Sequence, residues 1–331
     1  MPLPDSSISL INRLQNKDMV KKAQKKRKPA ARRRKKAGSK KNFPMKLFSF
    51  LILFGLLIFS MGAAGYVIFF KTTIANGATL QENIPEIIFE EPYSNIPELP
   101  VDIPPVKDSS LPMVAIIIDD MGYHKKIGNE LLELPMNLTF SFLAAAPFTT
   151  ELEEKAYQAG RCIFLHLPME PKSKEWDAGP GALLTGQSKE EQAHLFQQNI
   201  QAIPHAVGVN NHMGSLYTEN REAMDSLMVL IHERGLLFVD SFTTGASKGL
   251  IAAKAAGIRT ARRHIFLDNV HSQDKVCAQL KQLVIYAEEK GWAIGIGHPN
   301  GATLAALTNC RGRLLDRVQL VSAQELLVKF Q

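Results

Sequence analysis

Residues 114–122 read Val114-Ala115-Ile116-Ile117-Ile118-Asp119-Asp120-Met121-Gly122. The five apolar residues at the start of this stretch, three of them isoleucine, predict a strand that is buried on both faces, as in a parallel sheet. Two aspartates follow the apolar run directly, so this strand is expected to present two carboxylates at its carboxyl end. The same combination of a buried strand and a polar end recurs along the chain.

Further apolar runs predict strands at 138–143, 162–165, 206–209, 236–239, 265–267 and 293–296, with 318–321 as a candidate eighth strand. Helical patterns lie between them, near 125–134, 149–160, 189–202, 219–234, 246–256, 273–290 and 302–308. Two capping boxes, Ser188 with Glu191 and Ser322 with Glu325, mark helix starts. Strands that alternate with helices pair in parallel, which predicts an α/β fold, either a barrel or an open doubly wound sheet. The first strand is not followed by a Gly-rich phosphate-binding motif, which argues against a nucleotide-binding fold.

Polar side chains also follow the other predicted strands, namely His166 and Glu170, then Asn210, Asn211 and His212, then Asp240, and finally His298. Parallel strands carry their carboxyl ends on one face, where (β/α) barrels hold their active sites. We therefore expect these side chains to surround one opening. Aspartate, glutamate and histidine together suit a divalent metal such as zinc or manganese. Each cluster by itself is also typical of a helix cap or a loop hydrogen bond.

The run 114–122 resembles the Thr-Phe-Asp-Asp motif of carbohydrate esterase family 4, the NodB-type polysaccharide deacetylases. Three further motifs are similar to the divergent polysaccharide deacetylase branch of that family: His-Leu-Pro-Met-Glu at 166–170, Gly-Val-Asn-Asn-His-Met-Gly-Ser at 208–215 and Gly-His-Pro at 297–299. The resemblance covers roughly residues 112–330. It implies a distorted (β/α) barrel of about seven strands.

The resemblance also implies an activity, which is metal-assisted hydrolysis of an N- or O-acyl group on a cell-envelope glycan such as peptidoglycan. Zinc is the expected metal. Asp120 and His166 are expected ligands, and either His212 or Glu170 completes the set. Three protein ligands leave a position for water and the acyl oxygen.

The remaining polar residues receive catalytic roles under this resemblance. Asp119 is the expected general base, and His298 is the expected general acid because the pKa of histidine lies near the working pH. Asp240 would orient a ring nitrogen. Asn210 and Asn211 would donate hydrogen bonds to the oxyanion or to a sugar hydroxyl.

The sequence departs from the main family at two motifs. The His-x-x-x-His motif of the family reads His166-x-x-x-Glu170 here, and Asn210-Asn211-His212 stands where the family has Arg-x-Pro. These departures favour an alternative, a catalytically degenerate module of the same fold that binds an envelope glycan or protein. A metal-dependent glycosidase or phosphatase is a third hypothesis, since two carboxylates near the opening also suit glycosidase chemistry.

The net charge of +7 is concentrated at the N-terminus. Residues 1–46 carry 16 Lys and Arg against 2 Asp, a net charge of +14, so residues 47–331 carry 7 − 14 = −7. Such a density of like charges predicts a disordered tail. No aromatic residue precedes Phe43, so bases have no stacking platform and no nucleic-acid partner is expected. Contact with anionic lipid is the simpler role for this tail.

Residues 47–70 contain no charged side chain, and their length suits one transmembrane helix. A cleaved signal peptide is the competing interpretation, because small residues lie near the end of the run, but both the leader and the run exceed signal-peptide lengths. Lys and Arg are in excess on the N-terminal side, so the tail is expected in the cytoplasm and the rest outside it. The chain is then a single-pass inner-membrane protein with a proline-rich acidic linker at 71–111 and a deacetylase-like periplasmic domain at 112–331.

The cysteines and tryptophans allow further expectations. Cys162 lies in an apolar run and is expected to be a buried thiol, whereas Cys277 and Cys310 are a possible disulfide. The chain has no Cys-x-x-Cys pair, so a thiolate zinc site is not expected. Trp176 is a candidate for stacking on a sugar, while Trp292 precedes an apolar strand and is expected in the core.

Overall fold

The computed structural model describes residues 55–56, 58–60 and 111–330. The chain divides into two units, Met1–Thr79 and Leu80–Gln331. The predicted tail at 1–46 and almost all of the predicted linker lie outside the described residues. The predicted membrane segment at 47–70 lies within them only at 55–56 and 58–60, which are helical. In the part of the chain that the structure describes, no helix has both the length and the apolar character needed to cross a bilayer.

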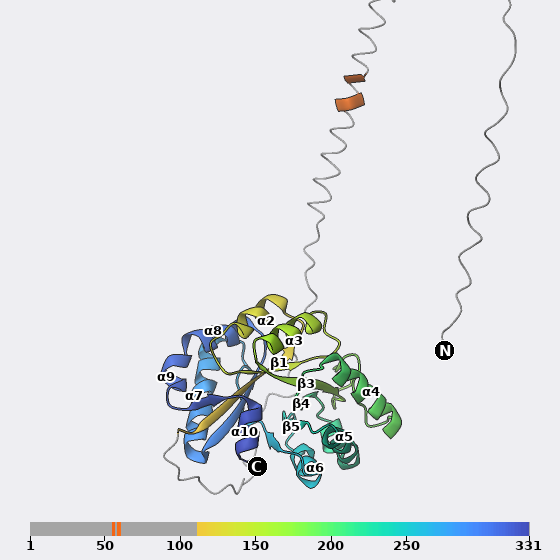
Figure 1. The fold of residues 1–331 in the computed structure, drawn as a ribbon, viewed down its shortest axis with the longest axis vertical. Helices are drawn as coiled ribbons and strands as arrows, with labels where there is room; N and C mark the ends of the chain where they lie inside the picture. Colours follow the sequence, from red (N-terminus) through yellow and green to blue (C-terminus); the bar gives the residue numbers. More distant parts are fainter. Residues whose placement is uncertain (1–54, 57, 61–110, 331) are drawn as a thin grey trace, which may run out of the picture. The chain divides into compact units, whose positions relative to one another are not determined.

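The second unit alternates strands with helices, as predicted (Figure 1). The strands are β1 (Met113–Met121), β2 (Thr139–Phe142), β3 (Cys162–Met169), β4 (Gly208–Met213), β5 (Leu237–Asp240), β6 (Thr260–Arg262), β7 (Ile265–Phe266), β8 (Trp292–Gly297) and β9 (Gln319–Val321). The helices are α2 (Lys125–Leu132), α3 (Thr149–Gln158), α4 (Lys189–Ala202), α5 (Arg221–Glu233), α6 (Gly249–Ala255), α7 (Gln273–Lys290), α8 (Gly301–Asn309), α9 (Arg311–Leu315) and α10 (Ala323–Lys329), with a 3₁₀ turn at Tyr217–Glu219. Strand β6 was not predicted, because its residues do not form an apolar run.

The strands form one nine-stranded parallel sheet in the order β6-β5-β4-β3-β2-β1-β8-β7, and β9 pairs with β1. No ladder joins the edge strands β6 and β7 among the described residues, but only two residues separate them. The Arg263 N–H donates to Asp240 of β5, and the His264 N–H donates to Ile294 of β8. The parallel α/β prediction is confirmed. The expected seven-stranded barrel is instead a curled, incompletely closed sheet of nine strands.

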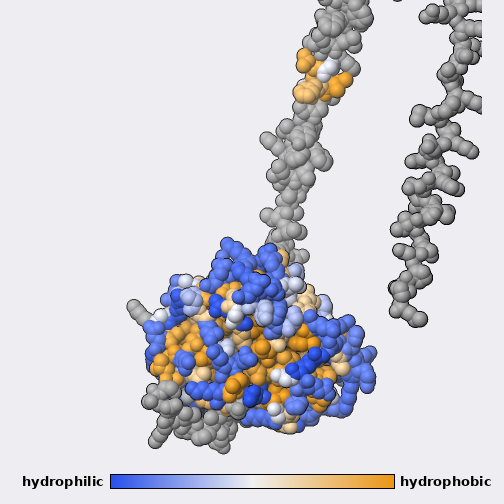
Figure 2. All heavy atoms as spheres, in the orientation of Figure 1, coloured by the Kyte–Doolittle hydropathy of each residue, from blue (hydrophilic) through white to orange (hydrophobic). Residues whose placement is uncertain are grey.

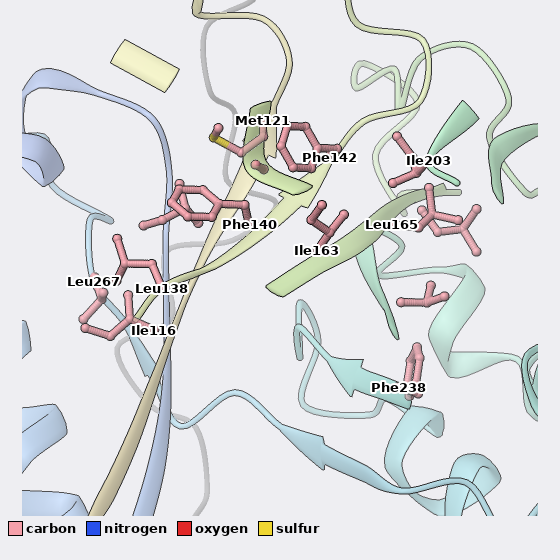
Figure 3. Close-up of a cluster of buried hydrophobic side chains, with 14 of the residues drawn as sticks. Ile116, Met121, Leu138, Phe140, Phe142, Ile163, Leu165, Ile203, Phe238 and Leu267 are labelled. Carbon is pink, nitrogen blue, oxygen red and sulfur yellow. The ribbon is translucent and has the colours of Figure 1, made fainter. Parts of the chain in front are cut away.

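Two hydrophobic clusters lie on the two sides of this sheet. The outer cluster packs the sheet against the surrounding helices and includes Phe140, Phe142 and Leu165 (Figure 3). The inner cluster joins Val239 of β5 to Ile294 of β8, although four strands separate β5 from β8. The inner cluster therefore runs along this face of the sheet from β5 to β8, and it includes Phe164 of β3 and Ile117 of β1. Hydrophilic residues cover much of the outer surface around α2 and α4 (Figure 2).

Helix α10 closes the end of the sheet at which the strands begin. Leu326 and Leu327 belong to the inner cluster, and Phe330 stacks on Trp292 with ring centroids 5.8 Å apart. Trp292 is 7% exposed, which confirms that it is a core residue. The opposite end of the curled sheet is therefore the end that holds polar side chains.

The predicted helix starts and one cysteine pair are present in the structure. Ser188 and Ser322 each form a capping box with the glutamate three residues later. A disulfide joins Cys277 in α7 to Cys310 at the end of α8. Cys162 is the free thiol, and it packs against the inner cluster.

Candidate metal centre

Two adjacent aspartates point toward the same histidine because β1 contains a bulge. Ile118 pairs with Phe140 and Met121 with Phe142, so β1 advances three residues where β2 advances two. Neighbouring side chains of a regular strand lie on opposite faces. At the bulge Asp120 has a φ of 51°, and the carboxylates of Asp119 and Asp120 lie 3.7 and 3.2 Å from His166 Nε2.

The prediction that strands end before the polar residues was wrong for β1, β3 and β4. Asp119, His166 and Asn210 all lie within their strands. Each of these strands continues from apolar into polar residues on the inward face of the curled sheet. The change from apolar to polar residues therefore does not mark the end of the strand.

Three ligand atoms converge beside the bulge. Asp120 Oδ1 lies 2.9 Å from His212 Nδ1 and 3.2 Å from His166 Nε2, and the two ring nitrogens lie 3.2 Å apart. Donor atoms around a tetrahedral zinc lie about 3.3 Å from one another, given zinc–nitrogen bonds of about 2.0–2.1 Å. Asp120 Oδ1 is buried and has no hydrogen bond of normal geometry. A buried oxygen without such a partner, facing two ring nitrogens, fits a site for a divalent cation.

Asn210 links this cluster to Asp119. Its Nδ2 lies 2.9 Å from each carboxylate oxygen of Asp119 and 3.0 Å from Ser241 Oγ. Its Oδ1 accepts a hydrogen bond from Ser141 and lies 3.2 Å from His166 Nδ1. Because an amide oxygen can only accept, Nδ1 is the ring nitrogen that donates to it, and Nε2 is the ring nitrogen that a metal ion could use.

Burial and neighbouring charges give the two aspartates different pKa values. Burial raises the pKa of Asp119 above its usual value, although His166 and His298 oppose the change. Burial also disfavours ionised Asp120, but His212 and His166 outweigh it and hold the pKa of Asp120 well below its usual value. Neighbouring carboxylates whose environments shift their pKa values in opposite directions are typical of functional sites.

A third buried carboxylate, that of Asp268, accepts hydrogen bonds from His298. The His298 N–H donates to Asp268 Oδ2 at 2.7 Å, and His298 Nδ1 lies 3.0 Å from Asp268 Oδ1. Burial disfavours the imidazolium, but Asp268 outweighs it and raises the pKa of His298 to about 9. Nε2 of His298 lies 4.0 Å from Asp120 Oδ2, so this ring faces the metal cluster.

Asp268 was missed in the sequence, although it directly follows the predicted strand at 265–267. Asn300 and Thr303 also donate to Asp268 Oδ2, at 2.8 and 2.6 Å. A polar side chain directly after a predicted strand is the same signal that indicated the other site residues, so Asp268 could have been found from the sequence.

Glu170, the alternative third ligand, lies outside the metal cluster. Its Oε2 accepts hydrogen bonds from the backbone N–H and the hydroxyl of Thr185, both at 2.7 Å. Of the two groups of described residues that could hold a metal ion, the one beside the bulge contains Asp120, His166 and His212, and Glu170 belongs to neither. The structure therefore places His212, and not Glu170, beside Asp120 and His166.

Two other predicted site residues make contacts within the protein. The Asn211 amide donates to the Met213 carbonyl and accepts from the Ser241 N–H, both at 2.8 Å. Asp240 accepts from Ser247 Oγ at 2.8 Å and from the Phe242 N–H at 2.9 Å. These contacts order the turn after β5, and none of them is to a histidine ring.

Non-glycine residues with left-handed backbone lie at this end of the sheet. Among the described non-glycine residues, those with positive φ are Asp120, Met213 and Phe242, at 51°, 51° and 54°. They lie at the carboxyl ends of β1, β4 and β5. Such conformations cost roughly 1–3 kcal/mol each and persist where the surrounding structure enforces them, as in functional sites.

A cavity of about 110 Å³ opens beside the metal cluster. Its lining includes Asp120 and His212, the loop after β2 at 143–145, and the loop after β3 at 177–180. Tyr123, His124, Pro168 and Met213 also line it. Any molecule in this cavity lies against two of the three candidate metal ligands.

The second unit is thus a curled parallel α/β sheet with an Asp–His–His cluster, and a second Asp and His lie beside this cluster. The family model described as divergent polysaccharide deacetylase matches residues 116–327, and the chain belongs to this family.

Two relatives support this assignment, and one solved structure has the same fold. The chain is 33% identical over 214 residues to the uncharacterized protein YibQ of Escherichia coli K12, covering 65% of this chain and 67% of the relative. It is 36% identical over 208 residues to an uncharacterized protein of Haemophilus influenzae, covering 63% and 74%. The crystal structure of an uncharacterized protein from Agrobacterium tumefaciens C58 shares the fold, with a TM-score of 0.63, 24% identity, and coverage of 67% and 92%.

Proposed function

We propose that this protein is a zinc-dependent hydrolase that removes acyl groups from a cell-envelope glycan such as peptidoglycan. The observation that carries the proposal is the convergence of Asp120, His166 and His212, with the buried Asp120 Oδ1 lacking a normal hydrogen bond. Membership of the divergent polysaccharide deacetylase family supports an acetylated carbohydrate as the substrate.

Asp120, His166 and His212 would hold the metal ion. Three protein ligands of this kind are typical of catalytic zinc sites. When bound, the ion would lower the pKa of a water molecule and polarise the acyl carbonyl. Asn210 supports this role by fixing the tautomer of His166, so that Nε2 is free to ligate.

Asp119 would act as the general base that accepts the proton of the attacking water. Its carboxylate is buried, and Asn210 Nδ2 lies 2.9 Å from both of its oxygens. This contact orients the carboxylate, while burial raises its pKa and makes it a better proton acceptor.

His298 would act as the general acid. With a pKa raised to about 9 by Asp268, its imidazole is protonated at neutral pH. The Nδ1 proton is held by Asp268, so Nε2 donates its proton to the leaving nitrogen or oxygen as the bond to the acyl carbon breaks. Asp268 therefore has the orienting role that the sequence analysis gave to Asp240.

The proposal places the protein in the inner membrane, with its basic tail in the cytoplasm and its second unit outside. The charge-free segment at 47–70 and the basic residues before it support this topology. The Cys277–Cys310 disulfide supports an oxidising compartment for the second unit. Protease added to spheroplasts is expected to digest the second unit and to leave an epitope at the N-terminus intact.

Metal content tests the proposal most directly. Elemental mass spectrometry of the full chain is expected to find about one zinc per chain, and Asp120→Ala and His212→Ala are expected to lose it. Glu170→Gln is the matched control, because Glu170 lies outside the cluster and its variant should keep the metal. A wild-type protein that neither contains nor takes up a divalent metal would reject the hydrolase and leave the binding module.

Product analysis tests the reaction. Acetylated peptidoglycan treated with the metal-loaded protein is expected to release acetate without new reducing ends, which distinguishes a deacetylase from a glycosidase. Asp119→Asn is expected to retain the metal and to lose acetate release. Full acetate release by Asp119→Asn would show that Asp119 is not the base.

A further inference from the structure

Among the residues that line the cavity beside the metal cluster, the charged side chains have one sign. Asp120 and Asp177 contribute carboxylates, and none of the described lining residues is Lys or Arg. Tyr123, His124 and His212 are its other polar side chains. The remaining lining is small and apolar, chiefly alanine and proline, so the cavity presents little that would bind an anion.

Asp177 holds its carboxylate on the loop between β3 and α4. Its Oδ1 accepts the Gly179 N–H at 2.8 Å, while the side chain remains exposed. Burial, and then the charges of Asp120 and Asp177, raise the pKa of the Tyr123 hydroxyl. Both carboxylates therefore act on the same hydroxyl, as expected of groups that share one cavity.

The charge of Asp177 remains uncompensated when the metal site is filled. A divalent cation balances the ionised carboxylates of Asp119 and Asp120, and neutral His166 and His212 add no charge. The full negative charge of Asp177 then acts on whatever enters the cavity. A second negative charge at short range would be disfavoured by roughly five- to tenfold in affinity at low salt.

We propose that this cavity binds the acylated sugar ring and selects an uncharged ring over a ring that carries a carboxylate, with Asp177 repelling the anion. This inference rests on the proposed glycan substrate, whose sugar it specifies. The two sugars of a peptidoglycan strand differ in this respect where the stem peptide has been removed, since N-acetylmuramic acid then carries a free lactyl carboxylate and N-acetylglucosamine does not.

Ligand-observed NMR on the zinc-supplemented full chain tests the selection at pH 8 and low salt, where histidines of ordinary pKa are neutral. The probes are N-acetylglucosamine, N-acetylmuramic acid and the methyl ester of N-acetylmuramic acid, which keeps the bulk of the lactyl group without its charge. The wild type is expected to bind the acid about five- to tenfold more weakly than the ester. Asp177→Asn is expected to reduce this ratio to about twofold or less while keeping the oxygen that accepts the Gly179 N–H.

Glu175→Gln is the matched control, because Glu175 is an exposed acid two residues away on the same loop and does not line the cavity. It should leave the ratio of ester to acid affinity unchanged. Equal affinity of the wild type for acid and ester, an unchanged ratio in Asp177→Asn, or no binding of any probe would overturn the inference. Selective binding of the ester without acetate release would reject the proposed hydrolase but keep the role of Asp177. Acetate release without a preference for the ester would reject the role of Asp177 but keep the hydrolase.

Discussion

Asn210 contacts both the proposed base and a proposed metal ligand through one amide group. Its nitrogen lies against Asp119, and its oxygen lies against Ser141 and His166. An amide suits this position, because one end donates to a carboxylate while the other accepts from a ring N–H. From the sequence, Asn210 was predicted to contact substrate, because the sequence does not reveal which neighbours its side chain meets.

Asn210→Ala is expected to lower the metal affinity about 10- to 100-fold, because His166 loses the acceptor that fixes its tautomer. Competition with a chelator measures this affinity on folded protein. Asn211→Ala, on the same strand, is the control: it removes turn contacts and should leave metal affinity near that of the wild type. Equal affinities in all three proteins would contradict the role given to Asn210.

Asp268→Asn is expected to lower the pKa of His298 from about 9 toward its ordinary value. The Asp268 carboxylate favours the charged imidazolium, so its removal makes the proton easier to lose. NMR titration of the His298 ring in the metal-free protein measures the pKa directly. In the active enzyme, the loss of activity at high pH should move to lower pH, since the acid must be protonated. An unmoved titration would show that Asp268 does not control His298.

At the scale of elements, β4 positions two of the site's side chains through its close approach to β3. Gly208 pairs with Phe164, and a Cβ at Gly208 would lie 2.5 Å from the nearest atom of that ring. The absence of a side chain at Gly208 therefore allows the register in which Asn210 faces His166 and His212 faces Pro168. The spacing of Asn210 and His212 by two residues then places both on the inner face.

Gly208→Ala is expected to lower the free energy of unfolding by about 1–3 kcal/mol through overpacking against Phe164. Urea denaturation of the full chain, followed by tryptophan fluorescence, measures the change. Gly186→Ala is the control, because a Cβ there meets no atom within 4 Å, and its effect should stay within about 0.5 kcal/mol. Equal stability of the two variants would show that β4 can shift without cost.

The alternation of strands and helices was predictable because buried strands and amphipathic helices have distinct periodicities. The gathering of Asp120, His166 and His212 at one end followed from parallel pairing. Strand β6 and the bulge in β1 were not predictable: the former lacks an apolar run, and the latter depends on pairing with β2. The choice between Glu170 and His212 also required the folded positions of both side chains.

At the scale of the whole second unit, one disulfide links helix α7 to the end of helix α8. It joins Cys277 to Cys310 across 33 residues of sequence, at the far end of the helix that begins beside His298. Such a cross-link stabilises a fold mainly by restricting the unfolded chain.

Replacement of Cys277 and Cys310 by serine is expected to lower the stability by about 3–4 kcal/mol, from the entropy of a loop of this length. Thermal unfolding with and without reductant checks it: the reductant should lower the midpoint of the wild type and of Cys162→Ser equally. It should leave the double variant unchanged. A wild-type midpoint that ignores complete reduction would contradict a stabilising role for this bond.

Arg263 and His264, the two residues between β6 and β7, set the circumference of the curled sheet. The Arg263 N–H donates to the backbone of β5, and the His264 N–H donates to that of β8. The covalent chain therefore spans the gap between β6 and β7, which no strand pairing closes among the described residues. Every other step around the ring is a strand pair of nearly constant width, about 4.8 Å. The width of the polar end of the sheet is therefore set by the covalent chain as well as by strand pairing, which leaves the loops around it as the parts that can change shape.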